Sequence, residues 1–138
     1  MKHKYLFLLI FLISACVQLP PTPQDIEAKK FQPLADKAVI YIVRPVVDSN
    51  VQGPVSIPGG MISTHQGTYY RLEVAPGLQR IEGAGASTAA VAINAEAGRI
   101  YFVEHTVLGT TREGLLSMWL RRIDEARGRK MVSEATLL

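Results

Sequence analysis

The sequence predicts a small all-β protein, an antiparallel β-sandwich of seven or eight strands with a short C-terminal helix. From residue 37 onward the chain consists of short apolar runs separated by glycine and proline. The breaks recur at roughly regular spacing, and no amphipathic helix of about ten residues separates the runs. Short strands connected in this way are typical of a sandwich and not of alternating strands and helices.

The first expected strand covers residues 38–43, which are apolar at every position and indicate a central strand buried on both faces. The stretch 69–74 alternates in polarity, so one set of side chains should point inward and the other outward. The inward set is Tyr70, Leu72 and Val74, and the outward set is Tyr69, Arg71 and Glu73. The remaining strands are expected at residues 51–57, 61–65, 78–82, 89–93, 99–107 and 115–123.

Two local signals refine this arrangement. Pro76-Gly77 suits a type II turn, which should join 69–74 to 78–82 as a hairpin. Asp124 can cap a short helix over residues 125–132. Gly128 interrupts that helix at an expected cost of about 1 kcal/mol.

The charge balance argues against nucleic acid as a partner. The net charge is +3, but two of the fifteen basic side chains, Lys2 and Lys4, lie in the first four residues. The rest of the chain carries thirteen basic and twelve acidic side chains and is nearly neutral, so it should not capture a polyanion by charge alone.

The N-terminus is typical of a secretory signal peptide. A positive start is followed by nine apolar residues at 5–13. As a helix this run would span about 14 Å, against about 30 Å of bilayer hydrocarbon, so it is too short to be a stable transmembrane helix. We therefore expect residues 1–15 to be a cleaved leader.

The leader ends in Ile13-Ser14-Ala15-Cys16, which resembles the lipobox of bacterial lipoproteins. The resemblance implies cleavage before Cys16, transfer of a diacylglycerol to its thiolate, and N-acylation by a fatty acid such as palmitate. It accounts for the only cysteine of the chain. Val17 follows the cysteine in place of aspartate, which favours the outer membrane, with the protein facing the periplasm.

Residues 16–36 contain four prolines, which favour extended backbone over helix. We expect this segment to be a lipid-anchored tether that holds a β-sandwich domain of residues 37–138 away from the bilayer. A helical turn or two near 25–31 is possible within it.

Three motifs resemble those of bacterial lipoproteins in the domain-of-unknown-function family 2846. They are Ile-Tyr-Ile-Val-Arg-Pro at 40–45, Gly-Thr-Tyr-Tyr-Arg-Leu-Glu-Val-Ala-Pro-Gly at 67–77, and Ala-Gly-Arg-Ile-Tyr-Phe at 97–102. The resemblance covers residues 38–132. Where the family often has an Asp-Gly or Asn-Gly turn, this chain has Pro-Gly-Gly at 58–60. The resemblance implies a small β-sandwich and assigns no activity.

The sequence predicts no catalytic residue, metal or cofactor. His65 and His105, the two histidines after the leader, are 40 positions apart, and we expect them at the surface or at strand ends. Glu104 next to His105 should point to the opposite face and not share a ligand with it. An enzyme would be favoured only if the two histidines met in a pocket.

Two groups of side chains are candidate contact sites. A basic cluster near the C-terminus could bind anionic lipid or lipopolysaccharide phosphate, or could simply be a solvated edge; it comprises Arg121, Arg122, Arg127, Arg129 and Lys130. Three aromatic residues, Tyr69, Tyr101 and Trp119, could stack on a sugar, or could belong to the core. The leading hypothesis is a non-catalytic envelope lipoprotein that binds or supports another envelope protein, and the alternative is a peptidoglycan- or polysaccharide-binding module.

Overall fold

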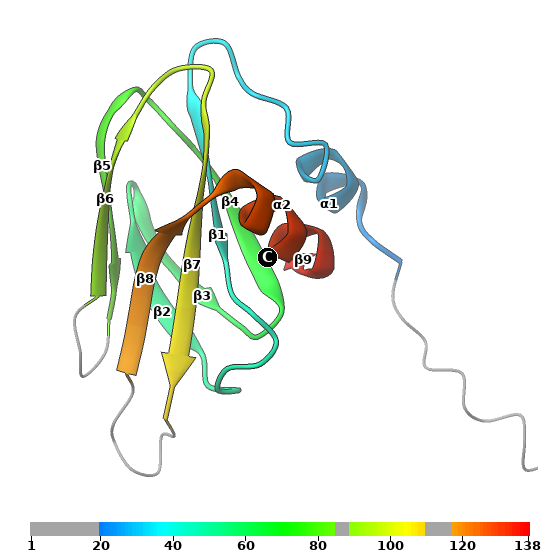
Figure 1. Cartoon of the computed structure of the whole chain (residues 1–138), viewed down its shortest axis with the longest axis vertical. Helices are drawn as coiled ribbons and strands as arrows, with labels where there is room; N and C mark the ends of the chain where they lie inside the picture. The colour runs from blue at the N-terminus through cyan, green and yellow to red at the C-terminus, as the bar shows by residue number, and fades with distance from the viewer. Residues whose placement is uncertain (1–19, 85–88, 110–116) are drawn as a thin grey trace, which may run out of the picture.

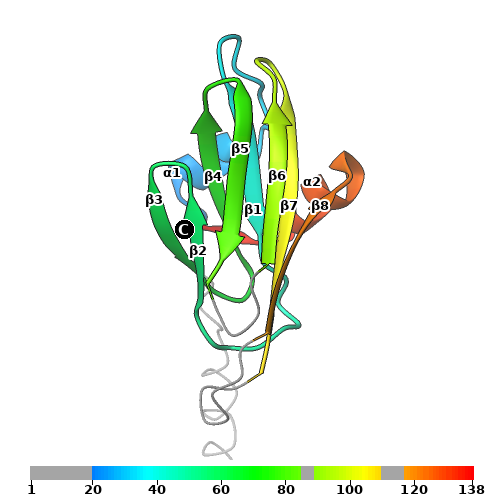
Figure 2. The same cartoon turned by 90° about the vertical axis from the view of Figure 1, so that its left-hand side faces the viewer.

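The computed structural model describes residues 20–84, 89–109 and 117–138. It is a β-sandwich of two sheets with two short helices on one side (Figures 1 and 2). The all-β prediction is confirmed. In chain order the elements are α1 Pro23–Ala28, β1 Ala38–Val43, β2 Gly53–Ile57, β3 Gly60–Thr64, β4 Thr68–Val74, β5 Gly77–Gly83, β6 Ala89–Ala95, β7 Ile100–Leu108, β8 Ser117–Ile123, α2 Glu125–Glu134 and β9 Thr136–Leu137.

The five-stranded sheet has the order β8-β7-β1-β4-β9, and the four-stranded sheet has the order β3-β2-β5-β6. Most neighbours are antiparallel, as predicted, but β1 runs parallel to β7, and β4 runs parallel to the two-residue β9. β1 lies at the centre of its sheet and all six of its residues are buried, which confirms the expectation from its uniformly apolar sequence.

The predicted hairpin at Pro76-Gly77 is wrong. β4 belongs to the five-stranded sheet and β5 to the four-stranded sheet, so this turn carries the chain from one sheet to the other. Gly77 has a φ of 126°, a conformation that a residue with a side chain rarely adopts. Pro76 does lie at a bend between the two strands, but a local signal does not reveal which strand the next strand will pair with.

The space between the sheets is filled by one apolar cluster. Its members come from seven strands of the two sheets, β1, β2 and β4 to β8, and they include Ile40, Ile42, Val55, Ile81, Ile93 and Val103. Leu72 and Val74 of β4 belong to it and Tyr70 packs against it, as the alternation predicted.

A second cluster lies on the other side of the five-stranded sheet, beneath the helices, and the expected outward position of Tyr69 is therefore wrong. Tyr69 is fully buried here with Phe31, Tyr41 and Phe102. The rings of Tyr41 and Phe102 stack with their centroids 5.3 Å apart. The outer face of this sheet is thus a second core and not a solvent surface.

Helix α1 is part of this second core, which corrects the expected tether over residues 16–36. Thr22 caps the helix, and Asp25, Ala28 and Phe31 are buried against the sheet. The Tyr41 hydroxyl donates to the Ala28 carbonyl over 2.6 Å. The folded body therefore begins near Pro23, fourteen residues before the predicted boundary.

Asp25 fastens α1 to the C-terminus. Its carboxylate accepts hydrogen bonds from Lys29 Nζ at 2.8 Å, the Tyr69 hydroxyl at 2.9 Å and the Leu137 amide at 3.0 Å. Burial alone would raise the pKa of Asp25, but these bonds outweigh it and hold the pKa below its ordinary value. The segment that sequence composition assigned to a tether is thus stabilised by contacts with residues far along the chain.

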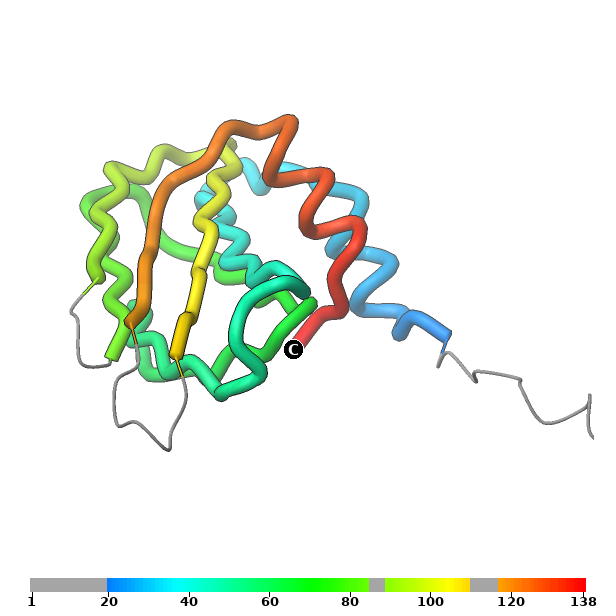
Figure 3. Tube along the Cα trace, turned by 60° about the horizontal axis from the view of Figure 1, so that its bottom comes forward, coloured from blue at the N-terminus to red at the C-terminus, as the bar shows by residue number. Residues whose placement is uncertain are grey.

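The predicted C-terminal helix is confirmed as α2, with the Asp124 side chain accepting from the Arg127 amide at 2.9 Å. Gly128, which the sequence suggested only as a destabilising interruption of this helix, is required for packing. A Cβ at this position would lie 2.2 Å from Phe102 Cγ, so only glycine lets α2 approach β7 this closely. Figure 3 shows α1 and α2 beside each other on this side of the molecule. Neither is long and apolar enough to cross a membrane, and the same holds for every helix in the described part of the chain.

Candidate functional site

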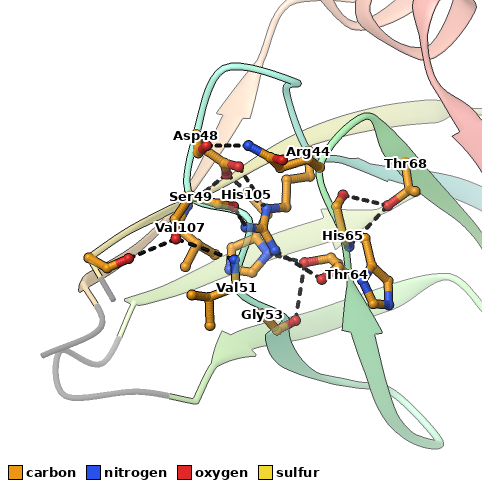
Figure 4. Close-up of polar contacts among 12 residues, drawn as sticks. Arg44, Asp48, Ser49, Val51, Gly53, Thr64, His65, Thr68, His105 and Val107 are labelled. Atoms are coloured by element: carbon orange, nitrogen blue, oxygen red, sulfur yellow. Dashed lines mark hydrogen bonds and ion pairs between the residues drawn. The ribbon is translucent and has the colours of Figure 1, made fainter. Parts of the chain in front are cut away.

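A buried polar network joins the two sheets at one end of the sandwich (Figure 4). It starts at Arg44, the residue after β1, whose side chain is completely inaccessible to solvent. Its guanidinium contacts the Asp48 carboxylate at 2.8 Å through Nε and the Thr64 carbonyl at 2.9 Å through Nη1, and it also donates to the Ser49 carbonyl. Thr64 ends β3, so Arg44 bridges the five-stranded and the four-stranded sheet.

Asp48 neutralises Arg44 and has a second bond. Its side chain is 2% exposed, and the same carboxylate oxygen that meets Arg44 accepts the Val107 amide at 3.0 Å. Removing water from two such charges is costly, and the cost is offset only when their hydrogen bonds are satisfied. The arrangement fixes the loop of residues 44–49 against the end of β7.

His105 occupies the same end, between the sheets. Its Nδ1 lies 2.9 Å from Thr64 Oγ1, and that hydroxyl donates to the Gly53 carbonyl at 3.1 Å. Since the hydroxyl hydrogen is used on Gly53, Nδ1 must carry the proton and donate to Thr64. Nε2 then holds a lone pair, and no partner for it exists among the described residues.

The burial of His105 has an electrostatic consequence. Desolvation, reinforced by the nearby Arg44 charge, lowers the pKa of His105 to about 4. The ring is therefore neutral at neutral pH, and protonating it would place an unpaired N–H in the core. Gly53 packs against it so closely that a Cβ there would lie 2.7 Å from His105 Cε1.

The loop held by this network displays two valines. Val46 is 66% exposed and Val47 is 90% exposed, on a backbone fixed at both ends by the buried Arg44–Asp48 pair. A groove of about 390 Å³ runs between this loop, the end of β7 and α2. Its wall includes Pro45, Val47, Thr106, Leu108, Met131 and Lys130, and a smaller hollow beside Val46 and Gly67 shares Pro45, Val47 and Met131 with it. We call the loop and this groove the valine surface.

The valine surface displays apolar groups, and the polar network lies behind it. Aliphatic side chains are displayed on a loop that the Arg44–Asp48 pair fixes, and the polar groups behind them are engaged with one another, except His105 Nε2, which has no partner among the described residues. Among the described residues no three His, Cys, Asp or Glu side chains come together as a metal site would require. Sequence analysis missed the network and the surface because charged residues in a loop, such as Arg44 and Asp48, are ordinarily exposed. The only signal was that Arg44 directly follows a fully apolar strand.

The histidines do not meet. His65 is exposed after β3, as predicted, whereas His105 is fully buried, so the expectation of a surface position is wrong for it. Glu104 does point to the face opposite His105, where its carboxylate lies 2.6 Å from Arg121 and 3.1 Å from Arg127.

The basic cluster is divided among different contacts. Arg121 and Arg127 are paired with the buried Glu104, and Arg129 pairs with Glu125 at 2.6 Å. Arg122 lies on the other face of β8, with its guanidinium 5.0 Å from the centre of the Tyr101 ring. Lys130 lines the valine surface. These residues are therefore not one free patch of positive charge.

Tyr69, Tyr101 and Trp119 do not form the sugar-stacking site that was one of the two readings of the sequence. Tyr69 lies in the core beneath the helices, and Tyr101 is buried between the sheets, where its hydroxyl accepts the Glu96 amide at 3.1 Å. Trp119 on β8 is 49% exposed. Alternation along each strand places the three rings in different environments, and stacking on one sugar needs them in one plane.

The lipobox residues Ile13, Ser14, Ala15 and Cys16 lie outside the described residues. Comparison of the chain with protein-family models and with curated proteins finds no match. The resemblance to family 2846 and the lipid attachment at Cys16 therefore stay predictions from the sequence.

Proposed function

We propose that this protein is a lipid-anchored module of the bacterial cell envelope, in the outer membrane and facing the periplasm, that works by binding another envelope protein. The leader and Cys16 support the anchor, through the lipobox resemblance. The valine surface supports binding, because its two exposed valines adjoin a groove whose wall includes further apolar side chains, and a continuous apolar patch of this kind is typical of a contact site.

The observation that carries the binding proposal is that one loop combines two exposed valines with a buried ion pair that holds its two ends together. A loop that only connected β1 to β2 would not need a fully buried Arg–Asp pair to hold it. A binding loop gains from such rigidity, because little conformational entropy is then lost when a partner docks. The partner should present an aliphatic or aromatic side chain to the groove, with polar groups at the rim near Lys130 and Glu134.

The anchor also fixes how far the body can stand from the bilayer. Helix α1 begins at Pro23, seven residues after Cys16, and an extended chain covers at most about 25 Å over that length. The module should therefore lie close to the membrane, with the helix-covered side near it and the four-stranded sheet away from it.

Site-specific photocrosslinking in cells tests the binding proposal. A photoreactive residue at Val47 should give a discrete crosslinked band with another envelope protein. The matched control is Leu78 on the open face of β5, which is similarly exposed and lies outside the valine surface. A partner band at Leu78 but not at Val47 would contradict the assignment of the surface, and no band at either position would contradict the binding role.

A further inference from the structure

The edge of the four-stranded sheet at β3 is open. β3 hydrogen-bonds to β2 on one side, and in the described part of the chain no strand lies beside its other side. Figure 2 shows β3 as the outermost strand of the front sheet. Its sequence, Gly-Met-Ile-Ser-Thr, contains no charged residue and no proline, and Met61 is 67% exposed. Soluble proteins usually protect an open edge with charge, proline or a cover, because a bare edge pairs with another strand.

The register shows which groups point outward. Pro58-Gly59 is a two-residue turn that closes the pair Ile57–Gly60, so the hydrogen-bonded pairs of this hairpin are 57–60, 55–62 and 53–64. The Pro54 carbonyl agrees with this pattern, since it faces away from β3 and accepts the Ala84 amide at 3.0 Å. The N–H and C=O groups of Met61 and Ser63 must therefore point to the open edge.

This edge is complementary to itself. If a second copy approaches antiparallel with Ile62 opposite Ile62, Met61 of each copy faces Ser63 of the other as a hydrogen-bonded pair. Four backbone hydrogen bonds then form. A small hydroxyl faces a long flexible side chain on the outer side, and no charges are opposed.

The geometry also agrees with anchoring in one membrane. The two-fold axis that relates two antiparallel edge strands of one continuous sheet stands perpendicular to that sheet. A rotation about it leaves α1 of both copies on the same side, behind the five-stranded sheets (Figure 2). Both tethers would leave toward one bilayer, and both open sheet faces would point away from it.

We propose that two copies of this protein pair through β3 on the membrane to form one continuous eight-stranded sheet. The shared orientation rests on the lipid anchor of the proposed function. Two five-residue strands bury less surface than a stable soluble dimer needs, which is about 1,200 Å² or more in total. Confinement to one surface supplies the missing effective concentration.

Cysteine crosslinking of the full-length protein in intact membranes tests the pairing. Ile62→Cys places two thiols opposite each other at a non-hydrogen-bonded pair, where Cβ atoms lie about 4.5–5.5 Å apart and a disulfide can close after a small adjustment. Mild oxidation should give several times more dimer with Ile62→Cys than with Leu78→Cys, the control on the same sheet. Equal amounts with the two variants would overturn the proposal.

Two charged variants in the Ile62→Cys background test the register. Met61→Lys with Ser63→Lys opposes like charges across the axis and should abolish the dimer. Met61→Lys with Ser63→Glu opposes unlike charges and should retain it. Met61 and Ser63 are both exposed, so both double variants should fold equally well. Equal crosslinking by the two variants would contradict this register.

Labelling the same samples with radioactive fatty acid separates this inference from the proposed function. Labelled protein that does not crosslink at position 62 refutes the dimer and leaves the anchor. Crosslinked protein without label supports the pairing and refutes the anchor.

Discussion

The two outer faces of the sandwich are built in opposite ways. The five-stranded sheet is covered by α1 and α2, and Tyr41, Tyr69 and Phe102 form a second core beneath them. The four-stranded sheet carries no helix, and its outer side displays Leu78, Met61 and small residues such as Ala90 and Ala92. The burial of individual strands reflects this difference. β1 of the five-stranded sheet is buried at all six positions, whereas β6 of the four-stranded sheet has accessible residues between its buried ones.

This contrast suggests a division of labour. The sheet beneath the helices is closed by the protein's own N- and C-terminal segments, and only the groove along α2 that belongs to the valine surface stays accessible there. The β3 edge and the valine surface, which lies between the loop of residues 44–49, the end of β7 and α2, remain for contacts with other molecules. The Arg44–Asp48–Thr64–His105 network holds the two sheets together, so perturbing it should affect both faces at once.

Removing Asp48 should have the largest effect on stability. Asp48→Ala leaves the buried Arg44 guanidinium without a counter-charge and the Val107 amide without its acceptor. We expect the free energy of unfolding to fall by about 3–5 kcal/mol in denaturant titrations. Glu82→Ala, which breaks the exposed Arg80–Glu82 pair on the open sheet, should change it by less than about 1 kcal/mol. Similar losses for the two variants would contradict the role given to the network.

Acid should weaken the joint between the two sheets, because the buried His105 ring resists protonation in the folded state. The pKa of His105 is lowered to about 4 in the folded state, against about 6.5 when unfolded. Its contribution is thus fully present above pH 6.5 and is lost as the pH falls toward 4. Between pH 7 and pH 4 this amounts to about 3 kcal/mol of unfolding free energy.

The measurement is urea unfolding across that pH range for the wild type and for His105→Gln. The variant should be less stable at pH 7 and show a flatter profile. His65→Gln, at the exposed histidine, should leave the wild-type profile unchanged. If His105→Gln unfolds with the same pH dependence as the wild type, the buried ring is not the group that titrates.

Adding one methyl group should cost much more stability on the covered face than on the open one. Gly128→Ala forces a Cβ into the Phe102 ring and should cost about 2–3 kcal/mol by displacing α2. Gly60→Ala on the open sheet meets no atom within 4 Å and should shift stability by less than about 0.5 kcal/mol. Thermal unfolding of the two variants measures the difference, and a tolerant Gly128 would mean that α2 does not pack as tightly as described.

Much of the fold was predictable because its strands are short apolar runs separated by glycine and proline. The run 38–43 identified the central strand, and Asp124 identified the start of α2. The partner of each strand was not predictable, as the sheet change at Gly77 shows, because pairing depends on contacts that no local window contains. Proline content suggested a tether over residues 16–36, but from Pro23 onward the long-range hydrogen bonds of Asp25 and the burial of Phe31 overrode that composition.

The candidate site was less predictable than the fold. Lone histidines and charged residues are usually at the surface, and His65 follows that rule. His105, Arg44 and Asp48 depart from it because three separate segments bring them together, and each satisfies part of another's hydrogen-bonding need. The basic cluster showed the converse: neighbours in sequence were divided between two faces of β8 and between separate acidic partners.

Fatty-acid labelling at Cys16 tests the central claim most directly. Cells fed labelled palmitate should yield labelled wild-type protein that sediments with the membranes, whereas Cys16→Ser should lose both the label and the sedimentation. Wild-type protein without label, or a variant that stays with the membranes as the wild type does, would contradict the proposal that this module is anchored by lipid.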